Sequence, residues 1–393
     1  MDIFKKCYDF KEAQLARQAG LYPYFHPLSS AQEPEVIIDG QKMIMIGSNN
    51  YLGLTTHPRV KEAAIKAIEK FGTGCTGSRF LTGTLDMHNQ LEAKLAKFLN
   101  KKAALVFSTG MQTNLGVISC LGTKDDILIT DKFDHASILD GCRLSYSMMR
   151  RFQHNDMDSL ERLLKGLDHN KGKMIIVDGI YSMEGDIANL PELVRLGKKY
   201  NARVLVDDAH GLGVLGKHGR GTAEHFGLEQ ETDLMMGTFS KSFAAIGGVV
   251  AGDFEVIDYI KHFARSMIFS AALPPALTAA VSAAVDVLQD EPELLTKLWH
   301  NADRMLKGFR EMGYDTGVAC TPIIPLMIGS REKAFALWKH LMAHGVFANP
   351  VMSPAVPEGR EMIRTSFSAA HTEAQLDKVL EEFRTAGKEL GLI

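Results

Sequence analysis

Short apolar runs alternate with helical segments between Met43 and about Pro275. Six runs have the length and composition of strands buried on both faces: 104–110, 126–131, 174–180, 204–210, 233–240 and 247–252. Such strands alternating with helices predict an α/β fold, with a mostly parallel central sheet that helices cover on both sides. Ligands of these sheets bind beyond the carboxyl ends of the strands, where the polar residues of the six runs gather.

The pattern changes after about Pro275. Two long helices (276–289 and 294–312) precede three strand-like runs (323–329, 345–351 and 361–368) and a closing helix from Glu373. We therefore predict a smaller α+β C-terminal domain over 286–393, after a large domain over 46–285. Residues 1–45 contain a helix, a proline-containing loop and a hairpin around Asp39 and Gly40. This N-terminal arm is too small for its own core, so we expect it to pack on the main domain or on a partner subunit.

Composition narrows the class of protein. The 393 residues are 46% hydrophobic and 23% charged, with a net charge of -3, as in a soluble globular protein with no attraction to nucleic acid. Five scattered cysteines without a C-x-x-C pair suggest neither a metal site nor a disulfide framework, and they fit a reducing cytoplasm.

Neither the N-terminus nor the most apolar long segment has the uninterrupted apolar sequence of a secretion signal or a membrane span. The N-terminus is charged and amphipathic, and the apolar segment from Met267 to Leu288 contains Pro274 and Pro275. We expect no transmembrane span and a cytoplasmic location. Peripheral membrane contact stays open, because it needs only one exposed apolar patch.

The stretch DLMMGTFSKSFAAIGG places Lys241 between hydroxyl side chains and glycines at the end of an apolar run. A partly desolvated lysine amine is a nucleophile, and its commonest use is a Schiff base with an aldehyde cofactor. Thr238 and Ser240 offer hydroxyls that could hold a phosphate. Together these features indicate pyridoxal 5'-phosphate (PLP), although an isolated S-K-S is more often an ordinary surface lysine.

Asp207 and Asp208 end the buried run VLVDD. Alternation along a strand places them on opposite faces, so we expect different roles. A carboxylate beside a pyridine nitrogen keeps that ring protonated, which makes PLP an electron sink. The alternative is a pair of helix-capping aspartates.

Residues 108–114 follow a strand and open a helix, an arrangement that favours phosphate binding at the free N–H groups of the first turn. It is not a Walker loop, because no lysine follows Gly110 at the required spacing. A capped helix start without a ligand explains the motif equally well.

Three further side chains have both functional and structural interpretations. His135 follows a strand and could stack on a flat ring, but a lone histidine is more often structural. Arg79 lies in the glycine-rich segment FGTGCTGSRFLTGT. Such a segment allows close approach to a ligand or a neighbouring subunit, but it is also typical of a flexible surface loop. Arg364 lies in an apolar run, where a cation needs a substrate carboxylate or a structural acid.

Six motifs occur together and in order: GSNNYLGL (47–54), DHASILDG (134–141), DGIYSMEGD (178–186), VDDAHGLGVLG (206–216), GTFSKS (237–242) and SAAHT (368–372). Through them the sequence resembles the α-oxoamine synthases. These fold-type I PLP-dependent transferases condense an amino acid with an acyl-CoA thioester and release CO2 and CoA. The resemblance implies a PLP cofactor, no metal, and a homodimer with active sites at its interface.

The resemblance also implies catalytic roles. Lys241 would be the Schiff-base lysine, Asp207 the partner of the pyridinium nitrogen, and His210 the hydrogen-bond partner of the ring oxygen. His135 and Ala209 would cover the two faces of the ring.

The remaining implied roles concern binding. Ser182 would lie near the ring, Arg364 would hold the substrate carboxylate, and Asn50, rather than Asn49, would be a second contact to the amino acid. The implied phosphate cradle consists of Thr109, Gly110, Met111, Thr238 and Ser240.

Within the family, GTGCTGSRFLTGTLDMH, HNDMDSLERLL and GVFANPVMSPAVP are most similar to the soluble bacterial serine palmitoyltransferases. This branch predicts a decarboxylative Claisen condensation of L-serine with palmitoyl-CoA to 3-ketodihydrosphingosine. Met111 stands where an aromatic residue is usual, and IRTSFSAAHT equally resembles 2-amino-3-ketobutyrate CoA ligase and 8-amino-7-oxononanoate synthase.

Two other classes are alternatives to these synthases. One is an aminotransferase or C–S lyase on the same fold, which needs no thioester. The other is a catalytically silent subunit, against which the presence of Lys241, Asp207, His135 and His210 argues.

Overall fold

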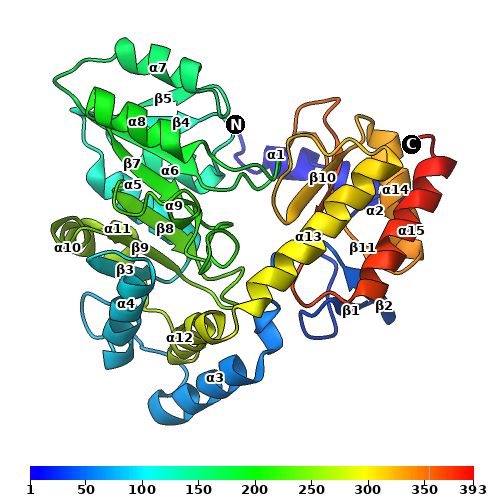
Figure 1. Ribbon diagram of the computed structural model, residues 1–393, viewed down its shortest axis with the longest axis horizontal. Helices are drawn as coiled ribbons and strands as arrows, with labels where there is room; N and C mark the ends of the chain where they lie inside the picture. The colour runs from blue at the N-terminus through cyan, green and yellow to red at the C-terminus, as the bar shows by residue number, and fades with distance from the viewer. Residues whose placement is uncertain (354) are drawn as a thin grey trace.

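The computed structural model describes residues 1–353 and 355–393. A larger and a smaller lobe are joined by the long helix α13 (Glu293–Met312) (Figure 1). The first half of α13 contributes Leu295 and Leu298 to the core of the larger lobe, and its second half contributes Met305 and Phe309 to the core of the smaller one. The helix therefore fixes the two lobes against each other.

A seven-stranded sheet forms the centre of the larger lobe. In spatial order its strands are β3 (Ala103–Phe107), β9 (Gly248–Gly252), β8 (Leu234–Thr238), β7 (Arg203–Asp207), β6 (Gly172–Asp178), β4 (Asp126–Asp131) and β5 (Met148–Phe152). Strand β9 runs antiparallel to both neighbours, and all other pairs are parallel. The carboxyl ends of β4, β6, β7 and β8 therefore meet at one edge of the sheet.

Alternate strand residues belong to two separate cores, one on each face of the sheet. Leu205 packs on one face, while Val204 and Val206 pack on the other. The first face is covered by α5 (Gly110–Leu121), α6 (Ala136–Leu144), α10 (Phe254–Phe263) and α11 (Arg265–Ile268). The opposite core includes α3 (Pro58–Phe71), α4 (Asp86–Phe98), α7 (Met157–Lys165), α8 (Leu190–Tyr200), α9 (Thr222–His225) and α12 (Pro275–Asp290).

The smaller lobe contains two three-stranded sheets. One has the order β10 (Ile323–Met327), β13 (Met362–Ser366), β12 (Asn349–Val351), and the other β1 (Glu35–Ile38), β2 (Gln41–Met45), β11 (Val346–Phe347). Helices α14 (Arg331–Ala343) and α15 (Glu373–Glu389) complete this lobe. The chain begins with α1 (Lys5–Asp9) and α2 (Glu12–Gln18), which bury no residue, and the short 3-10 helix η1 (Leu54–Thr56) precedes α3.

The predicted fold-type I architecture is confirmed, with a mostly parallel sheet and a small C-terminal α+β unit. The hairpin turn has positive φ at Asp39 (50°) and Gly40 (77°), as a two-residue turn between twisted strands requires. The edge strand β5 was absent from our predicted strands because Arg150 and Arg151 interrupt its apolar pattern.

The β1–β2 hairpin, which lies within the predicted N-terminal arm, packs with the smaller lobe. Strand β2 pairs with β11, and Ile44 and Ile46 lie in the core of the smaller lobe. The hairpin of the predicted arm is thus part of the C-terminal unit, because its apolar face is covered there. Among the described helices, none combines the length and apolar character needed to cross a membrane.

Candidate active site

A cavity of about 370 Å³ opens at the carboxyl ends of the parallel strands. It gathers residues that are far apart in the sequence but follow neighbouring strands. Its lining includes Thr109, Gly110, Met111, Asn114, His135, Ser137, Asp178, Ser182, Asp207, Ala209, His210, Thr238, Ser240 and Lys241. All the predicted catalytic and cofactor-binding residues are in this set.

Lys241 is in the loop that follows β8 and lines the cavity. Burial lowers the pKa of its amine to about 8, although the carboxylates of Asp207 and Asp178 partly oppose this shift. About one tenth of the amine is therefore neutral at pH 7, whereas an ordinary lysine is almost entirely protonated. A buried neutral amine is the form that can attack an aldehyde or accept a proton.

Asp207 ends β7 with its side chain toward the cavity. The amide nitrogen of Asn114 donates to Asp207 Oδ2 (2.6 Å), and the backbone N–H of Ala209 donates to Oδ1 (3.0 Å). Asn114 Nδ2 is also 2.8 Å from Ser137 Oγ. Hydrogen bonds to both carboxylate oxygens fix this charge in a site where an unpaired carboxylate would be costly.

Asp208 is held by a different group of residues. Its Oδ2 accepts the backbone N–H of Thr222 (2.9 Å), and its Oδ1 accepts the Thr222 hydroxyl (2.5 Å). Burial raises the pKa of Asp208 to about 7, against the opposing effect of the Thr222 hydrogen bonds. The two adjacent carboxyl groups are therefore separated, as strand alternation predicts.

His135 caps α6 and lines the same cavity. Its Nδ1 lies 2.8 Å from Ser137 Oγ, and its backbone N–H donates to Asp178 Oδ2 (2.8 Å). The pKa of Asp178 is raised well above its ordinary value, first by burial and then by the charge of Asp207. Asp178 is a cavity residue to which the sequence interpretation gave no role.

A series of buried hydrogen bonds connects His210 with the smaller lobe. The Nδ1 atom of His210 lies 2.7 Å from the hydroxyl of Tyr51, which donates to Asn49 Oδ1 at 3.3 Å. Arg364 Nη2 donates to the same oxygen at 3.1 Å. Burial is the main cause that lowers the pKa of His210 and raises that of Tyr51 to about 12, so both groups are neutral near pH 7.

Arg364 is almost fully buried in β13. Its Nε donates to the carbonyl oxygen of Ser182 (2.6 Å), in addition to the bond with Asn49. Within residues 1–353 and 355–393, no carboxylate forms an ion pair with this guanidinium. A buried cation without an acid is a candidate receptor for an anionic ligand group.

The end of the cavity near α5 suits a phosphate. Thr109 caps this helix by accepting the N–H of Gln112 (3.0 Å), and the first-turn N–H groups of Gly110 and Met111 have no acceptor within the helix. Thr238 Oγ1 and Ser240 Oγ lie 2.9 Å apart beside them. A Cβ on Gly110 would be 2.7 Å from Thr238 Oγ1, so only glycine allows this close approach.

Asn49 and Asn50 line a second cavity of about 700 Å³, which shares Ser240, Lys241 and Ile246 with the first. The amide nitrogen of Asn50 donates to Thr55 Oγ1 (2.8 Å) and to Gln32 O (3.1 Å), while its buried Oδ1 has no partner among the residues that the structure describes. Asn49 is bonded to Arg364 instead. The sequence motif could not distinguish these adjacent amides, because their partners lie elsewhere in the chain.

Arg79 has a structural contact rather than a place in the cavity lining. Its guanidinium is buried and binds both carboxylate oxygens of Glu92, at 2.7 and 3.0 Å. Asn114, Asp178 and Tyr51 also contribute to the site, and the motifs alone assign them no role. Only their positions inside or beside the recognised motifs could have indicated them.

The donor set fits PLP. It offers a helix N-terminus with two hydroxyls for a phosphate, a buried amine for an aldehyde, and a fixed carboxylate for a ring nitrogen. The model of the family "Aminotransferase class I and II" matches residues 41–383. The chain belongs to the class I and II aminotransferase family.

Relatives within this aminotransferase family include the serine palmitoyltransferase of Sphingobacterium spiritivorum, 51% identical over 95% of this chain and 94% of the relative. The serine palmitoyltransferase of Bacteriovorax stolpii is 52% identical over 96% and 90%. The 8-amino-7-oxononanoate synthase of Thermoanaerobacter pseudethanolicus is 46% identical over 96% of each chain.

Among solved structures, the serine palmitoyltransferases have a higher TM-score and identity with this chain than an 8-amino-7-oxononanoate synthase has. A serine palmitoyltransferase variant from S. paucimobilis with a bound PLP–myriocin aldimine superimposes with a TM-score of 0.96 at 37% identity, covering 100% of both chains. The 8-amino-7-oxononanoate synthase of Francisella tularensis gives a TM-score of 0.77 at 26% identity, covering 89% of this chain and 99% of the other.

Proposed function

We propose that the protein is a PLP-dependent acyltransferase that condenses L-serine with palmitoyl-CoA to give 3-ketodihydrosphingosine, CoA and CO2. The observation that carries this proposal is the identity of about half of the residues with curated serine palmitoyltransferases over nearly the whole chain. The lower identity and TM-score of 8-amino-7-oxononanoate synthases make that reaction the second candidate.

PLP, when bound, supplies an electron sink for a carbanion at the α-carbon of the amino acid. Lys241 would bind its aldehyde carbon, and once the amino group of the substrate has taken its place there, the freed amine would accept the α-proton. Asp207 would hold the proton on the ring nitrogen. The phosphate would lie against Thr109, Gly110, Met111, Thr238 and Ser240.

The other predicted residues would orient the cofactor and the amino acid. His135 and Ala209 would pack against the ring, His210 would hydrogen-bond its oxygen, and Ser182 would lie beside it. Arg364 would bind the substrate carboxylate, supported by its burial without an acid. Asn50 stays the predicted second contact, and the bond from Arg364 to Asn49 makes Asn49 a competing candidate.

The second cavity is a candidate path for the acyl chain, because it reaches Lys241 and part of its wall is apolar. Leu28, Met45, Ile246, Leu277 and Phe347 contribute to its lining. Leu277 and Phe347 belong to the apolar segments SMIFSAALPPAL and GVFANPVMSPAVP. Pro354 of the second segment lies outside the described residues. Each buried CH2 contributes about 0.8 kcal/mol, so a long channel would select strongly against acetyl-CoA.

The test is thiol release by the PLP-loaded protein with a matrix of amino acids and acyl-CoA thioesters. We expect fast release with serine and palmitoyl-CoA, and slow release with glycine and acetyl-CoA or alanine and pimeloyl-CoA. Product mass would identify the keto amino alcohol. Preference for alanine and pimeloyl-CoA would instead assign the protein to the 8-amino-7-oxononanoate synthase branch.

We also infer a cytoplasmic homodimer. Large apolar side chains are exposed in the glycine-rich loop (Phe80 and Leu81), in the cavity lining (Ile246) and at the end of α11 (Phe269). A second copy covering them would also complete the active site, as the family resemblance implies. Peripheral membrane contact stays a prediction, for which exposed Phe4, Tyr8 and Phe10 of the arm are the candidate residues.

A further inference from the structure

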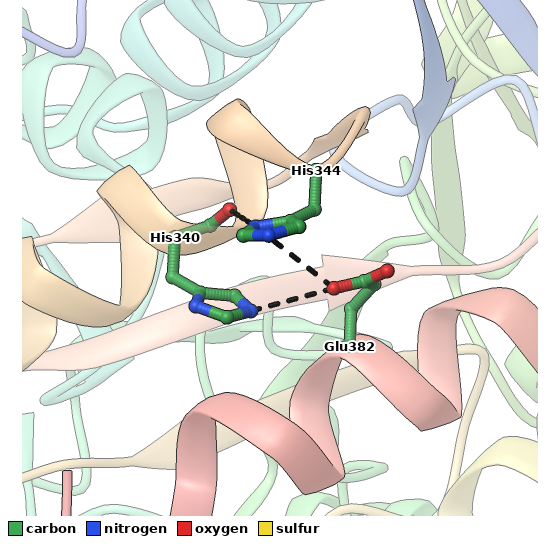
Figure 2. A group of neighbouring side chains, drawn as sticks. All are labelled: His340, His344 and Glu382. Carbon is green, nitrogen blue, oxygen red and sulfur yellow. Dashed lines mark hydrogen bonds and ion pairs between the residues drawn. The ribbon is translucent and has the colours of Figure 1, made fainter. Parts of the chain in front are cut away.

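His340, His344 and Glu382 form a compact group on the smaller lobe, outside both cavities (Figure 2). One ligand atom from each residue lies within 4.8 Å of the others. His340 Nε2 is 3.3 Å from Glu382 Oε2, and His344 Nδ1 is 4.0 Å from the same oxygen. Two imidazoles thus converge on one carboxylate oxygen.

The secondary structure creates this convergence. His340 is in the last turn of α14 and His344 caps the helix, so the spacing of four residues places both rings on one face. The rings stack with their centroids 4.1 Å apart and an angle of 23° between their planes. Glu382 reaches them from the neighbouring helix α15.

The shorter of these two distances, between His340 and Glu382, matches the spacing of metal ligands better than that of a strong hydrogen bond. A charge-assisted bond between an imidazolium and a carboxylate is about 2.7–2.9 Å long. Around a tetrahedral Zn²⁺, bonds of about 2.0–2.1 Å separate neighbouring ligand atoms by about 3.4 Å. The 3.3 Å between His340 and Glu382 has this value, and the half-exposed His344 can turn to close the remaining distance.

Neighbouring groups can orient the ligands. Glu389 Oε2 lies 3.6 Å from His340 Nδ1, the nitrogen that does not face Glu382. Outer contacts of this kind fix ring orientation in zinc sites. His344 Nδ1 lies 2.8 Å from the carbonyl oxygen of His340 and would exchange this contact for the ion when its ring turns. Two imidazoles and one carboxylate select Zn²⁺ or a similar transition metal over Mg²⁺ and Ca²⁺, which prefer oxygen ligands.

We propose that His340, His344 and Glu382 bind one divalent transition-metal ion of the zinc type, with water completing its coordination. The ion would connect the end of α14 to α15. Gly345 and β11 follow His344 directly, and Phe347 of β11 lines the second cavity. The site would therefore stabilise the segment that carries this part of the cavity wall.

The test uses full-length, PLP-loaded protein without an affinity tag, cleared of metal with a chelator. We expect calorimetric titration with Zn²⁺ to give one site per chain, and Co²⁺ at the same site to give visible absorption bands of a nitrogen- and oxygen-ligated ion. His344→Ala and Glu382→Gln should each weaken binding about tenfold or more. The side chains of His344 and Glu382 are both at least partly exposed, so we expect these two variants to fold.

The matched control is His262→Ala, which removes another helical histidine that lies beside an acid, Asp258 at 3.7 Å. It should bind Zn²⁺ as the unchanged protein does. Zn²⁺ should also raise the melting temperature of the unchanged protein and of His262→Ala, but not of His344→Ala. Absence of binding to the unchanged protein, or equal binding by all variants, would overturn the proposal.

Discussion

Asp207 and Asp208 are adjacent buried carboxyl groups with different partners. Asp207 accepts hydrogen bonds from Asn114 and Ala209 while facing the cavity, whereas Asp208 binds both donors of Thr222. The first arrangement leaves a carboxylate available to a ligand. The second uses the carboxylate to hold the start of α9.

Asp207→Asn should therefore reduce kcat much more than Asp208→Asn, because only Asp207 would keep the cofactor nitrogen protonated. We expect a loss of about a hundredfold or more for Asp207→Asn, equivalent to roughly 2.7 kcal/mol in the barrier. Steady-state kinetics with serine and palmitoyl-CoA would measure it. A greater kinetic loss in Asp208→Asn would mean that the assignment of the two faces is wrong.

Lys241→Ala should bind PLP without a covalent bond and should not turn over, because the buried amine both attaches the cofactor and accepts the substrate proton. Borohydride reduction followed by mass spectrometry should find PLP on the unchanged chain and none on the variant. The exposed Lys217→Ala is the control and should behave as the unchanged protein. Near-normal activity in Lys241→Ala would contradict the assignment.

The residue types and order of the motifs were sufficient to locate the cavity, since the predicted catalytic and cofactor-binding residues line it. The partners of those residues were not predictable. Tyr51 meets His210 across 159 positions, and Asn114 meets Asp207 across 93. Local periodicity contains no information about such contacts, which depend on how the lobes and helices pack.

At the scale of elements, His154 joins the end of β4 to the loop after β6. Its Nδ1 is 3.0 Å from Asp131 Oδ1, and its Nε2 is 3.2 Å from Asp186 Oδ2. Burial alone would lower the pKa of His154, but the two carboxylates outweigh it and raise the pKa to about 9. A cation is thus held between two acids, beside the stacked ring of Phe133.

This shift predicts a pH-dependent stability. Because the folded-state pKa exceeds the ordinary 6.5, the contribution of His154 is complete below about pH 6.5 and is lost as the pH rises through 9. The difference corresponds to roughly 3 kcal/mol. Denaturant unfolding should show His154→Ala less stable by about this amount at pH 6, and by much less at pH 9.5.

The control for that measurement is His169→Ala, an exposed histidine in the turn before β6. Its unfolding free energy should follow that of the unchanged protein at every pH. A destabilisation of His154→Ala that is constant from pH 6 to 9.5 would show that the side chain acts through packing alone.

The predicted strands also show what a sequence pattern can reveal about elements. Strands β4, β6, β7 and β8 are predictable because each is a continuous apolar run that is buried beyond its first residue or throughout. Strand β5 pairs only with β4 at the sheet edge and exposes most of its residues, so its sequence lacks that run. Its existence depends on the neighbouring strand rather than on its own composition.

At the scale of the whole molecule, the exposed apolar residues predict self-association. We expect sedimentation equilibrium to give twice the chain mass of 43.3 kDa, because Leu81 and Phe269 are each at least three-quarters exposed in the single chain. Leu81→Glu should weaken the dimer and reduce activity together, while Phe254→Glu, an exposed residue of α10, should do neither. A fully active monomer would contradict the inference.

Strand β2 lies between β1 and β11, and its neighbour Ile46 packs in the same core as Phe383 of α15. On the ribosome, β1 and β2 are synthesised before the larger lobe, and β11 and α15 are synthesised after it. The larger lobe can therefore fold while translation continues, but the smaller lobe must wait for β11 and α15. A ribosome that stalls late would leave an apolar hairpin uncovered, exposed to chaperones and to aggregation.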